Sequence, residues 1–486
     1  MSGISRNARC PCGTGAKYKH CCLGKVDWDA IERGRGDRFR HLSVRGRNFA
    51  FVELICEILL LDSDRRLRSM EDYKKAFTAQ NVRRLNEGIA RIWPPDLDIQ
   101  SALRSVRMGV SGFYIGDYAK DQLLRGIVRH SAYASKLLVA DPFVYPLSVR
   151  DKYSPIENPE QHRSQTLRNV NLWLGLLPWI QADLVTVIRT PCDFDHRLNW
   201  ESMKEQEEKF AGSPELSEAA KITVNEMIHR HSEAWKFRDL VLTLPDNALL
   251  DEFQRVAPLA EGISKEDLLA YVHRRRAADP DFLEPLAPES GSQLHMMSSG
   301  AGYNVACMVA ELTGSYLVTD LYVKWKEIEL DRRDRADEIE AWSPFAKAMQ
   351  EATLRYLDDV SLEDALALRK DGRLEDLRVF LRKVWSHACD TSSFSAVNGQ
   401  LFAEELRSEI RKAEDEWAQI DRELLRDTGG IGAGLATAAT MIGSGQGEFL
   451  AAATILAGVP LLGASTWKRR GFSKRFPAAF FLRLGK

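Results

Sequence analysis

Residues 137–141 read Leu-Leu-Val-Ala-Asp, a short apolar run that is followed by an aspartate. Comparable apolar, β-branched runs occur at 184–188, 240–244 and 315–319, and helical stretches separate them. Short strands that alternate with helices are typical of βα units, which build parallel sheets. The sequence therefore predicts an α/β domain with a mainly parallel sheet over residues 131–340.

An aspartate follows each of the four predicted strands. These residues are Asp141, Asp193, Asp246 and Asp320. Because the carboxyl ends of parallel strands lie at one edge of a sheet, the side chains are expected to converge there. Converging carboxylates favour a hard divalent cation, Mg²⁺ or Mn²⁺. We predict a catalytic site in which Asp141, Asp193 and Asp320 hold a metal ion that activates water, with Asp246 as a further contributor. Aspartate is also a common turn and helix N-cap residue, which is the alternative interpretation.

A glycine-rich segment precedes the last predicted strand. Ser299, Gly300 and Gly302 open a predicted helix at 303–312, whose free backbone N–H groups are expected to bind a phosphate. An acidic edge beside such a helix is typical of a metal-dependent nuclease or phosphohydrolase. The pair Thr319-Asp320 after the last strand loosely resembles the corresponding element of PIN-like nucleases.

Four of the chain's eight cysteines lie within thirteen residues near the N-terminus. They are Cys10, Cys12, Cys21 and Cys22. Zinc prefers four soft ligands in a tetrahedron, and two short cysteine pairs joined by a turn can supply all four. Gly13 and Gly15 allow the backbone to turn tightly enough. We predict a zinc site on the four cysteines, with His20 as an alternative ligand.

At residues 5–22 the sequence resembles the SEC-C motif, the short zinc module of the C-terminal tail of the SecA translocase and of many otherwise unrelated bacterial proteins. The resemblance rests on Arg6-Asn7, Cys10-Pro11-Cys12-Gly13, Lys17-Tyr18-Lys19 and Cys21-Cys22. Thr14 stands where the family usually has Ser, and the module lies at the N-terminus. Four thiolates and one zinc ion carry a net charge of about −2, which nearby basic residues offset. The resemblance implies either a zinc staple for a segment too short to fold alone or a docking surface for a partner.

Six arginines lie between Arg33 and Arg47, with Phe39 and Phe49 close by. Such a segment could follow a phosphate backbone and stack on bases. The alternative is a solvated linker whose arginines pair with Asp29, Glu32 and Asp37. The net charge of −2 excludes a globally basic nucleic-acid binder. The predicted partner is therefore a protein or a nucleic acid, contacted locally by the zinc module and this segment.

Helices are predicted at 49–60, 78–93 and 401–426, the last with one apolar stripe. Between 428 and 467 the only charged residue is Glu448, and a basic tail follows as far as residue 475. This stretch predicts an apolar hairpin. Each half is roughly 22 to 25 Å long as a helix, which is short of a bilayer's hydrocarbon core. The hairpin is predicted either to pack in the protein's own core or to contact a membrane.

The sequence divides into five predicted units: a zinc module at 1–25, an arginine-rich linker and helical region at 26–130, the α/β domain at 131–340, a helical domain at 341–427, and the apolar hairpin with its basic tail at 428–486. The N-terminus carries no apolar leader, so the protein is expected in the cytoplasm, at most peripheral to the inner membrane. We predict a zinc-binding recognition or sensor protein, with a bacterial stress or phage-defence role by analogy. The alternatives are a nuclease or phosphohydrolase and a membrane-inserting effector.

Overall fold

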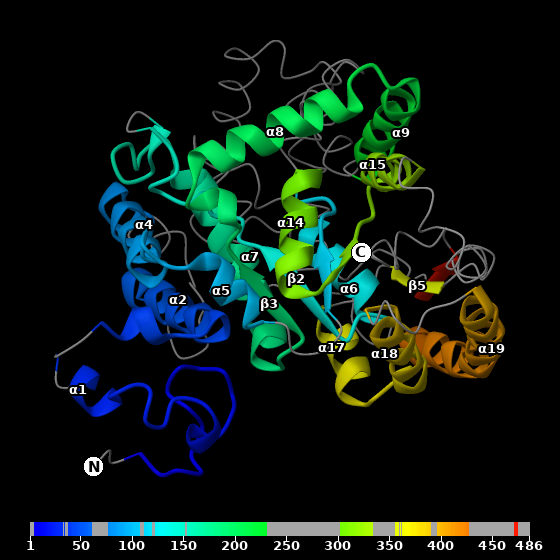
Figure 1. Cartoon of the computed structure of the whole chain (residues 1–486), viewed down its shortest axis with the longest axis horizontal. Helices are drawn as coiled ribbons and strands as arrows, with labels where there is room; N and C mark the ends of the chain where they lie inside the picture. The colour runs from blue at the N-terminus through cyan, green and yellow to red at the C-terminus, as the bar shows by residue number, and fades with distance from the viewer. Residues whose placement is uncertain are drawn as a thin grey trace, which may run out of the picture.

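The structure of the protein is a computed structural model (Figure 1). It describes residues 4–32, 34, 37–60, 76–106, 111–118, 122–150, 153–230, 302–333, 355–358, 360, 362–389, 396–426 and 471–474. The predicted strand at 240–244 and the apolar stretch at 428–467 lie outside these residues. The described part is an α/β fold with a parallel sheet, a cysteine cluster at the N-terminus and helices at the C-terminal end, which confirms the predicted fold class.

The central sheet has four parallel strands in the order β3-β2-β1-β4. Their bounds are β1 Ser111–Tyr114, β2 Lys136–Ala140, β3 Val185–Ile188 and β4 Tyr316–Val318. Three of them match the runs expected at 137–140, 184–188 and 315–319. The strand β1, which pairs with both β2 and β4, was not expected from the sequence. The described residues also form a small antiparallel pair, β5 Arg355–Asp358 with β6 Gly471–Lys474.

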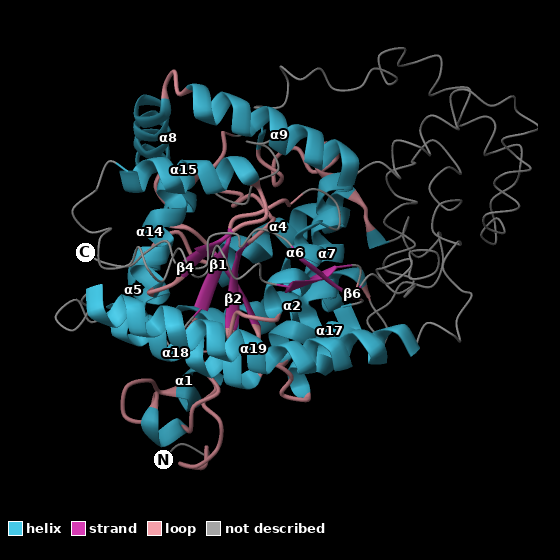
Figure 2. Cartoon of the chain, turned by 90° about the vertical axis from the view of Figure 1, so that its right-hand side faces the viewer, coloured by secondary structure: helices cyan, strands magenta, loops and turns pink. Residues whose placement is uncertain are grey.

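Helices surround the sheet on both sides (Figure 2). Before β1 the chain forms η1 Tyr18–His20, α1 Trp28–Glu32, η2 Arg38–His41, α2 Val44–Leu59, α4 Ala79–Ile92 and α5 Ile99–Arg104. Between β1 and β4 the described helices are α6 Gln122–Ser131, α7 Arg163–Gln181, η4 Pro191–Asp193, α8 His196–Phe210, α9 Pro214–Arg230 and α14 Tyr303–Thr313. After β4 come α15 Tyr322–Arg333, α17 Leu362–Lys370, α18 Glu375–Cys389 and α19 Ala396–Arg426.

Several of these helices begin where a short polar side chain caps the free N–H groups of the first turn. Ser43 caps α2, Thr78 caps α4 and Asp98 caps α5. At its other end, α14 stops at Gly314, whose φ of 67° is the left-handed conformation that glycine adopts most easily. The expected helices at 49–60, 78–93, 303–312 and 401–426 thus correspond to α2, α4, α14 and α19.

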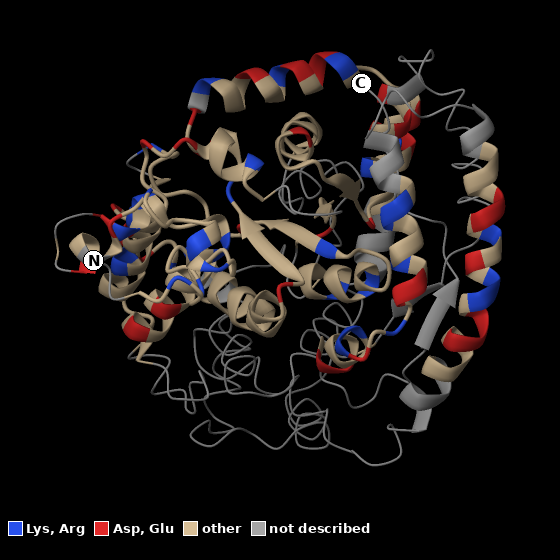
Figure 3. Ribbon diagram, turned by 60° about the horizontal axis from the view of Figure 1, so that its bottom comes forward, with Lys and Arg blue, Asp and Glu red and all other residues tan. Residues whose placement is uncertain are grey.

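One hydrophobic core joins the sheet to the helices. The same buried cluster includes Val44 of α2, the strands, and Ile420 of α19. Within this core Phe51 packs edge-on against Trp173, with ring centroids 4.7 Å apart. Charged residues lie mainly on the peripheral helices, while the strands carry few (Figure 3). Within the part of the chain that the structure describes, no helix is both long and apolar enough to cross a membrane.

Candidate metal centre

The cysteine cluster is built by a tight turn and a short 3-10 helix. The turn at Gly13 and Gly15, with φ of 81° and 83°, uses backbone conformations that other residues rarely adopt. An antiparallel bridge between Arg9 and Lys17 closes the turn. The η1 helix ends just before Cys21 and Cys22, which lie close to Cys10 and Cys12.

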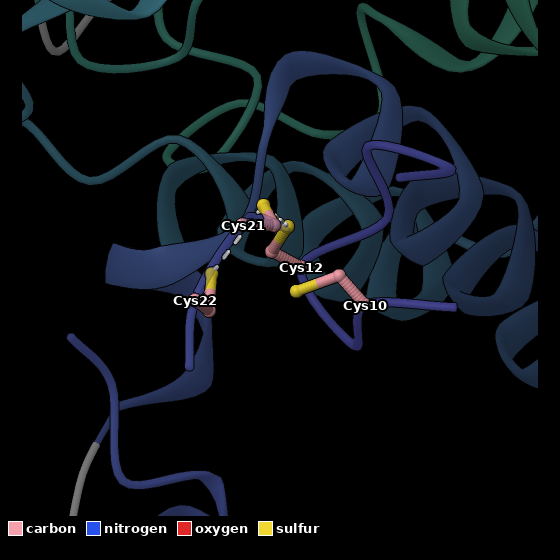
Figure 4. Close-up of side chains that lie close together, drawn as sticks. All are labelled: Cys10, Cys12, Cys21 and Cys22. Carbon is pink, nitrogen blue, oxygen red and sulfur yellow. Dashed lines mark hydrogen bonds between the residues drawn. The ribbon is translucent and has the colours of Figure 1, made fainter. Parts of the chain in front are cut away.

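The four thiols face one another, as Figure 4 shows. Cys10, Cys12, Cys21 and Cys22 place their Sγ atoms within 4.8 Å of one another. Two of these distances are 3.4 Å, from Cys12 to Cys21, and 3.7 Å, from Cys21 to Cys22. A tetrahedron with Zn–S bonds of about 2.3 Å has edges of roughly 3.8 Å. The cluster therefore has the size that a four-cysteine zinc site requires. His20 is exposed and does not belong to the group.

The local environment gives the thiols different pKa values. Burial raises the pKa of Cys12 to about 11, and burial together with the neighbouring thiols also raises the pKa of Cys22. Burial opposes ionisation of Cys21 as well, but hydrogen bonds with Thr14 and the other cysteines outweigh it and lower the pKa of Cys21. The Thr14 hydroxyl lies 3.4 Å from the Sγ of both Cys12 and Cys21. Metal binding must displace the remaining thiol protons, because thiolates are the ligands.

The module has a small hydrophobic core of its own. Tyr18 and Trp28 are buried together with Cys10 and Cys12. Basic side chains surround this core and are exposed to solvent. They are Arg6, Arg9, Lys17, Lys19 and Lys25. The surface of the module is therefore cationic around a cluster whose zinc complex would carry a charge of about −2.

Asp141, at the end of β2, is a buried structural carboxylate. Its Oδ2 lies 2.8 Å from Nη2 of Arg189, and its Oδ1 accepts a hydrogen bond of 3.0 Å from Trp173 Nε1. Both members of the ion pair are buried, with side-chain exposures of 4% for Asp141 and 1% for Arg189. Burial raises the pKa of Asp141, and the guanidinium opposes this rise. Arg189 directly follows β3, so its position was visible in the sequence but its role was not.

Asp193 and Gly302 act at helix starts. Asp193 Oδ2 accepts hydrogen bonds from the Thr190 backbone N–H at 2.8 Å and from the Thr190 hydroxyl at 3.3 Å, which closes the η4 turn. Gly302 is the N-cap of α14, and a Cβ added there would lie 2.9 Å from Gln206 Oε1. Ser299, Gly300 and Asp246 lie outside the described residues. For Asp193, the structure shows a turn residue: Thr190 is the N-cap of η4, and Asp193 is the third residue of the helix and accepts from it.

Asp320, after β4, forms hydrogen bonds and an ion pair with residues that were not predicted from the sequence. Its Oδ1 accepts hydrogen bonds from Tyr114 at 3.0 Å and from the Asp117 backbone N–H at 3.2 Å, and its Oδ2 pairs with Arg129 at 3.2 Å. Tyr114 and Asp117 belong to β1 and the turn after it. The signal for them was the run of aromatic and β-branched residues at 113–115, which ends, like the other strands, just before an aspartate.

Asp141, Asp193 and Asp320 do not form a metal-binding group in the described part of the chain. The strand β1 lies between β2 and β4, so the strands that Asp141 and Asp320 follow are two strand spacings, roughly 9 to 10 Å, apart. Apart from the four cysteines, no group of three His, Cys, Asp or Glu residues in the described ranges could hold a metal ion. A Mg²⁺ or Mn²⁺ site therefore has no support among these residues.

The described arginines of the Arg33–Arg47 segment have partners within the protein. Arg38 pairs with Glu53 at 3.4 Å, Arg40 with Asp96 at 2.6 Å and Arg45 with Asp183 at 3.2 Å. Arg47 is buried, donates to the Ile92 carbonyl and lies 5.2 Å above the Trp93 ring. These contacts hold the segment against the rest of the fold. The exposed basic residues of the zinc module lie outside this segment, closer to the N-terminus.

Comparison with known proteins identifies the module. Residues 6–24 match the family model of the SEC-C motif, which confirms the resemblance found in the sequence. No curated protein and no solved structure matches this chain significantly. The match places a metal-binding module of known type on the four-cysteine cluster, and the geometry of that cluster is compatible with zinc.

Proposed function

We propose that this chain is a zinc-binding recognition protein, in which Cys10, Cys12, Cys21 and Cys22 hold one zinc ion and the folded module presents a docking surface to a partner. The observation that carries the proposal is the approach of all four Sγ atoms to within 4.8 Å of one another inside the SEC-C match. Four cysteine ligands occupy all four coordination positions of a tetrahedral zinc ion. Such a closed site has no position for substrate or water, so its role is structural.

The exposed residues of the module support a docking role. Its apolar side chains, Tyr18 and Trp28, are already buried in its own core. What a partner would meet is the set of exposed cations, among them Arg6, Arg9 and Lys19. This charge favours a partner with an acidic surface, and we propose a protein as that partner. A place in a stress or phage-defence response is a finer hypothesis that rests on analogy.

Metal analysis of the purified full-length protein tests the zinc proposal. We expect one zinc ion per chain, and its loss in Cys12→Ser, because a hydroxyl is a poor replacement for a buried thiolate ligand. Cys307→Ser is the matched control, since Cys307 lies on α14 and outside the cluster. Metal-free parent protein, or a Cys12→Ser variant with full zinc content, would refute the proposal.

A further inference from the structure

The turn that carries Cys12 rests directly on the start of α2. The Cys12 carbonyl accepts hydrogen bonds from the Ser43 backbone N–H at 2.9 Å and from the Ser43 hydroxyl at 2.8 Å. The same hydroxyl oxygen accepts from the Gly46 N–H at 3.0 Å, which caps the helix. One side chain therefore binds both a predicted zinc ligand and the first turn of α2.

At Gly13 and Gly46 the backbone of the turn packs directly against the backbone of α2. A Cβ on Gly46 would lie 2.2 Å from the Cys12 carbonyl oxygen, and a Cβ on Gly13 would lie 2.4 Å from Gly46 Cα. Both distances are far shorter than any real contact of a methyl group. The turn and the helix can therefore approach this closely only because both positions are glycine.

Two residues after Gly46, the same helix contacts the edge of the sheet. The Asn48 side chain donates from Nδ2 to the Val187 carbonyl at 2.7 Å and accepts at Oδ1 from the Val187 N–H at 2.9 Å. Val187 lies in β3, the outermost strand on that side of the four-stranded sheet. The buried amide thus takes the place of a neighbouring strand at this residue.

A second connection runs alongside the first. Arg45, between Ser43 and Gly46, lies 3.2 Å from Asp183, and Lys136 at the start of β2 lies 2.7 Å from the same carboxylate. The Asp183 side chain is half exposed, so this connection is weaker than the buried one through Asn48. Both connections join the start of α2 to the sheet and to the turn before β3.

We propose that α2 couples the metal centre to the edge of the sheet. When zinc holds the Cys12 turn, the Cys12 carbonyl fixes Ser43 and the first turn of α2, and this keeps Asn48 on Val187. When the metal is removed, the turn loosens and both the start of α2 and β3 become less protected. The inference rests on the proposed zinc site. It makes Ser43, Gly46 and Asn48 positioning residues for a metal that they do not touch.

Coupling of this kind is reciprocal, and this gives the test. If zinc stabilises the contact of Asn48 with β3, then that contact must strengthen zinc binding by the same factor. Asn48→Ala should therefore weaken the zinc affinity of the full-length protein by roughly three- to tenfold, the range expected for losing the net contribution of a hydrogen bond or two. Competition with a chelating dye measures the affinity.

Asn169→Ala is the matched control. Asn169 is equally buried and donates to the Pro142 carbonyl at 2.9 Å, but it lies on α7 and not on the path from the module to β3. Its replacement should leave zinc affinity unchanged. If Asn48→Ala does not fold, Ser43→Ala tests the link between the Cys12 turn and α2 by the same measurement. Ser105→Ala is its control, since the Ser105 hydroxyl donates to the nearby Ala102 carbonyl.

Hydrogen exchange of the parent protein, with zinc and after chelation, gives the second measurement. We expect chelation to speed exchange in peptides that cover the start of α2 and β3, and to leave α19 unchanged. A parent that binds zinc but shows faster exchange only within residues 5–24, or an Asn48→Ala variant with unchanged zinc affinity, would overturn the coupling alone. A parent that binds no zinc would overturn the proposed function together with it.

Discussion

At the scale of single residues, the sequence shows where strands end but not what the side chains there will meet. Asp141 and Asp320 both follow strands, as predicted, yet each is paired with an arginine, Arg189 and Arg129. Those arginines come from β3's end and from α6, so only the folded arrangement shows the pairs. The four cysteines could be identified because their ligand geometry is set by local spacing alone.

The first prediction at this scale concerns Asp141. Asp141→Asn keeps the shape of the side chain but leaves Arg189, which is 1% exposed, without its counter-ion. Removing one partner of a buried ion pair typically costs about 3–5 kcal/mol of folding free energy. We therefore expect a loss of this size in a urea denaturation experiment.

Asp96→Asn is the control for that measurement. Asp96 pairs with Arg40, and both side chains are more than half exposed, so the loss of this ion pair should cost no more than about 1 kcal/mol of folding free energy.

The same variants can be incubated with DNA and RNA in Mg²⁺ or Mn²⁺. An Asp141→Asn protein that is as stable as the parent and loses a cleavage activity of the parent would favour the catalytic interpretation instead.

At the scale of elements, long periodic segments were predictable and one short strand was not. The helices α4 and α19 show clear apolar periodicity over many residues, α2 is a long and largely apolar segment, and three strands are short apolar or β-branched runs. The strand β1 is as long as β3, but it begins with Ser111 and Gly112 and so lacks the apolar or β-branched run of the other strands, and glycine is a poor strand former. The aspartates were expected to converge because the carboxyl ends of parallel strands lie at one edge of a sheet, and the sequence did not show that β1 separates β2 from β4.

Gly112 shows why the strand has this composition. A Cβ on Gly112 would lie 2.6 Å from Val318 Cγ2 and 3.1 Å from Tyr316 Cε2, both on β4. The glycine therefore makes room for large side chains of the next strand. We expect Gly112→Ala to destabilise the protein by about 1–3 kcal/mol, the usual effect of overpacking a core.

A double-mutant cycle tests this explanation. Val318→Ala removes the methyl group that the new Cβ would meet, so the double mutant should be more stable than the sum of the two single effects predicts. Additive losses, measured by urea denaturation of all four proteins, would show that Gly112 is required for a reason other than its contact with Val318.

At the scale of the whole molecule, two arginines of the C-terminal helices bind the backbone between α6 and β2. Arg369 of α17 donates to the carbonyls of Ser131, Ala134 and Ser135, and Arg378 of α18 donates to that of Ala132 at 2.9 Å. These carbonyls lie at the end of α6 and in the turn to β2, where a helix leaves its last acceptors unpaired. Burial and the charge of Arg378 lower the pKa of Arg369 to about 9, but it stays protonated at neutral pH.

These contacts cross the predicted boundary between an α/β domain at 131–340 and a helical domain at 341–427. The shared core from α2 to α19 and the two arginines join the two ranges. If the ranges unfold together, a change in the arginine contacts must affect the sheet as well as the helices. If they are independent, the effect must stay within the helices.

Arg378→Met is the variant that separates these cases. The methionine keeps much of the buried stem, but Ala132 loses its donor and Glu375, 2.9 Å from Arg378 in the native protein, loses a partner. An unsatisfied buried carbonyl costs about 1–3 kcal/mol, and we expect a loss of that size. Arg411→Met on the exposed face of α19 should change stability by no more than about 0.5 kcal/mol. Hydrogen exchange then decides the question: faster exchange in both β2 and α18 means one cooperative unit, whereas faster exchange in α18 alone means that the helices form a unit of their own.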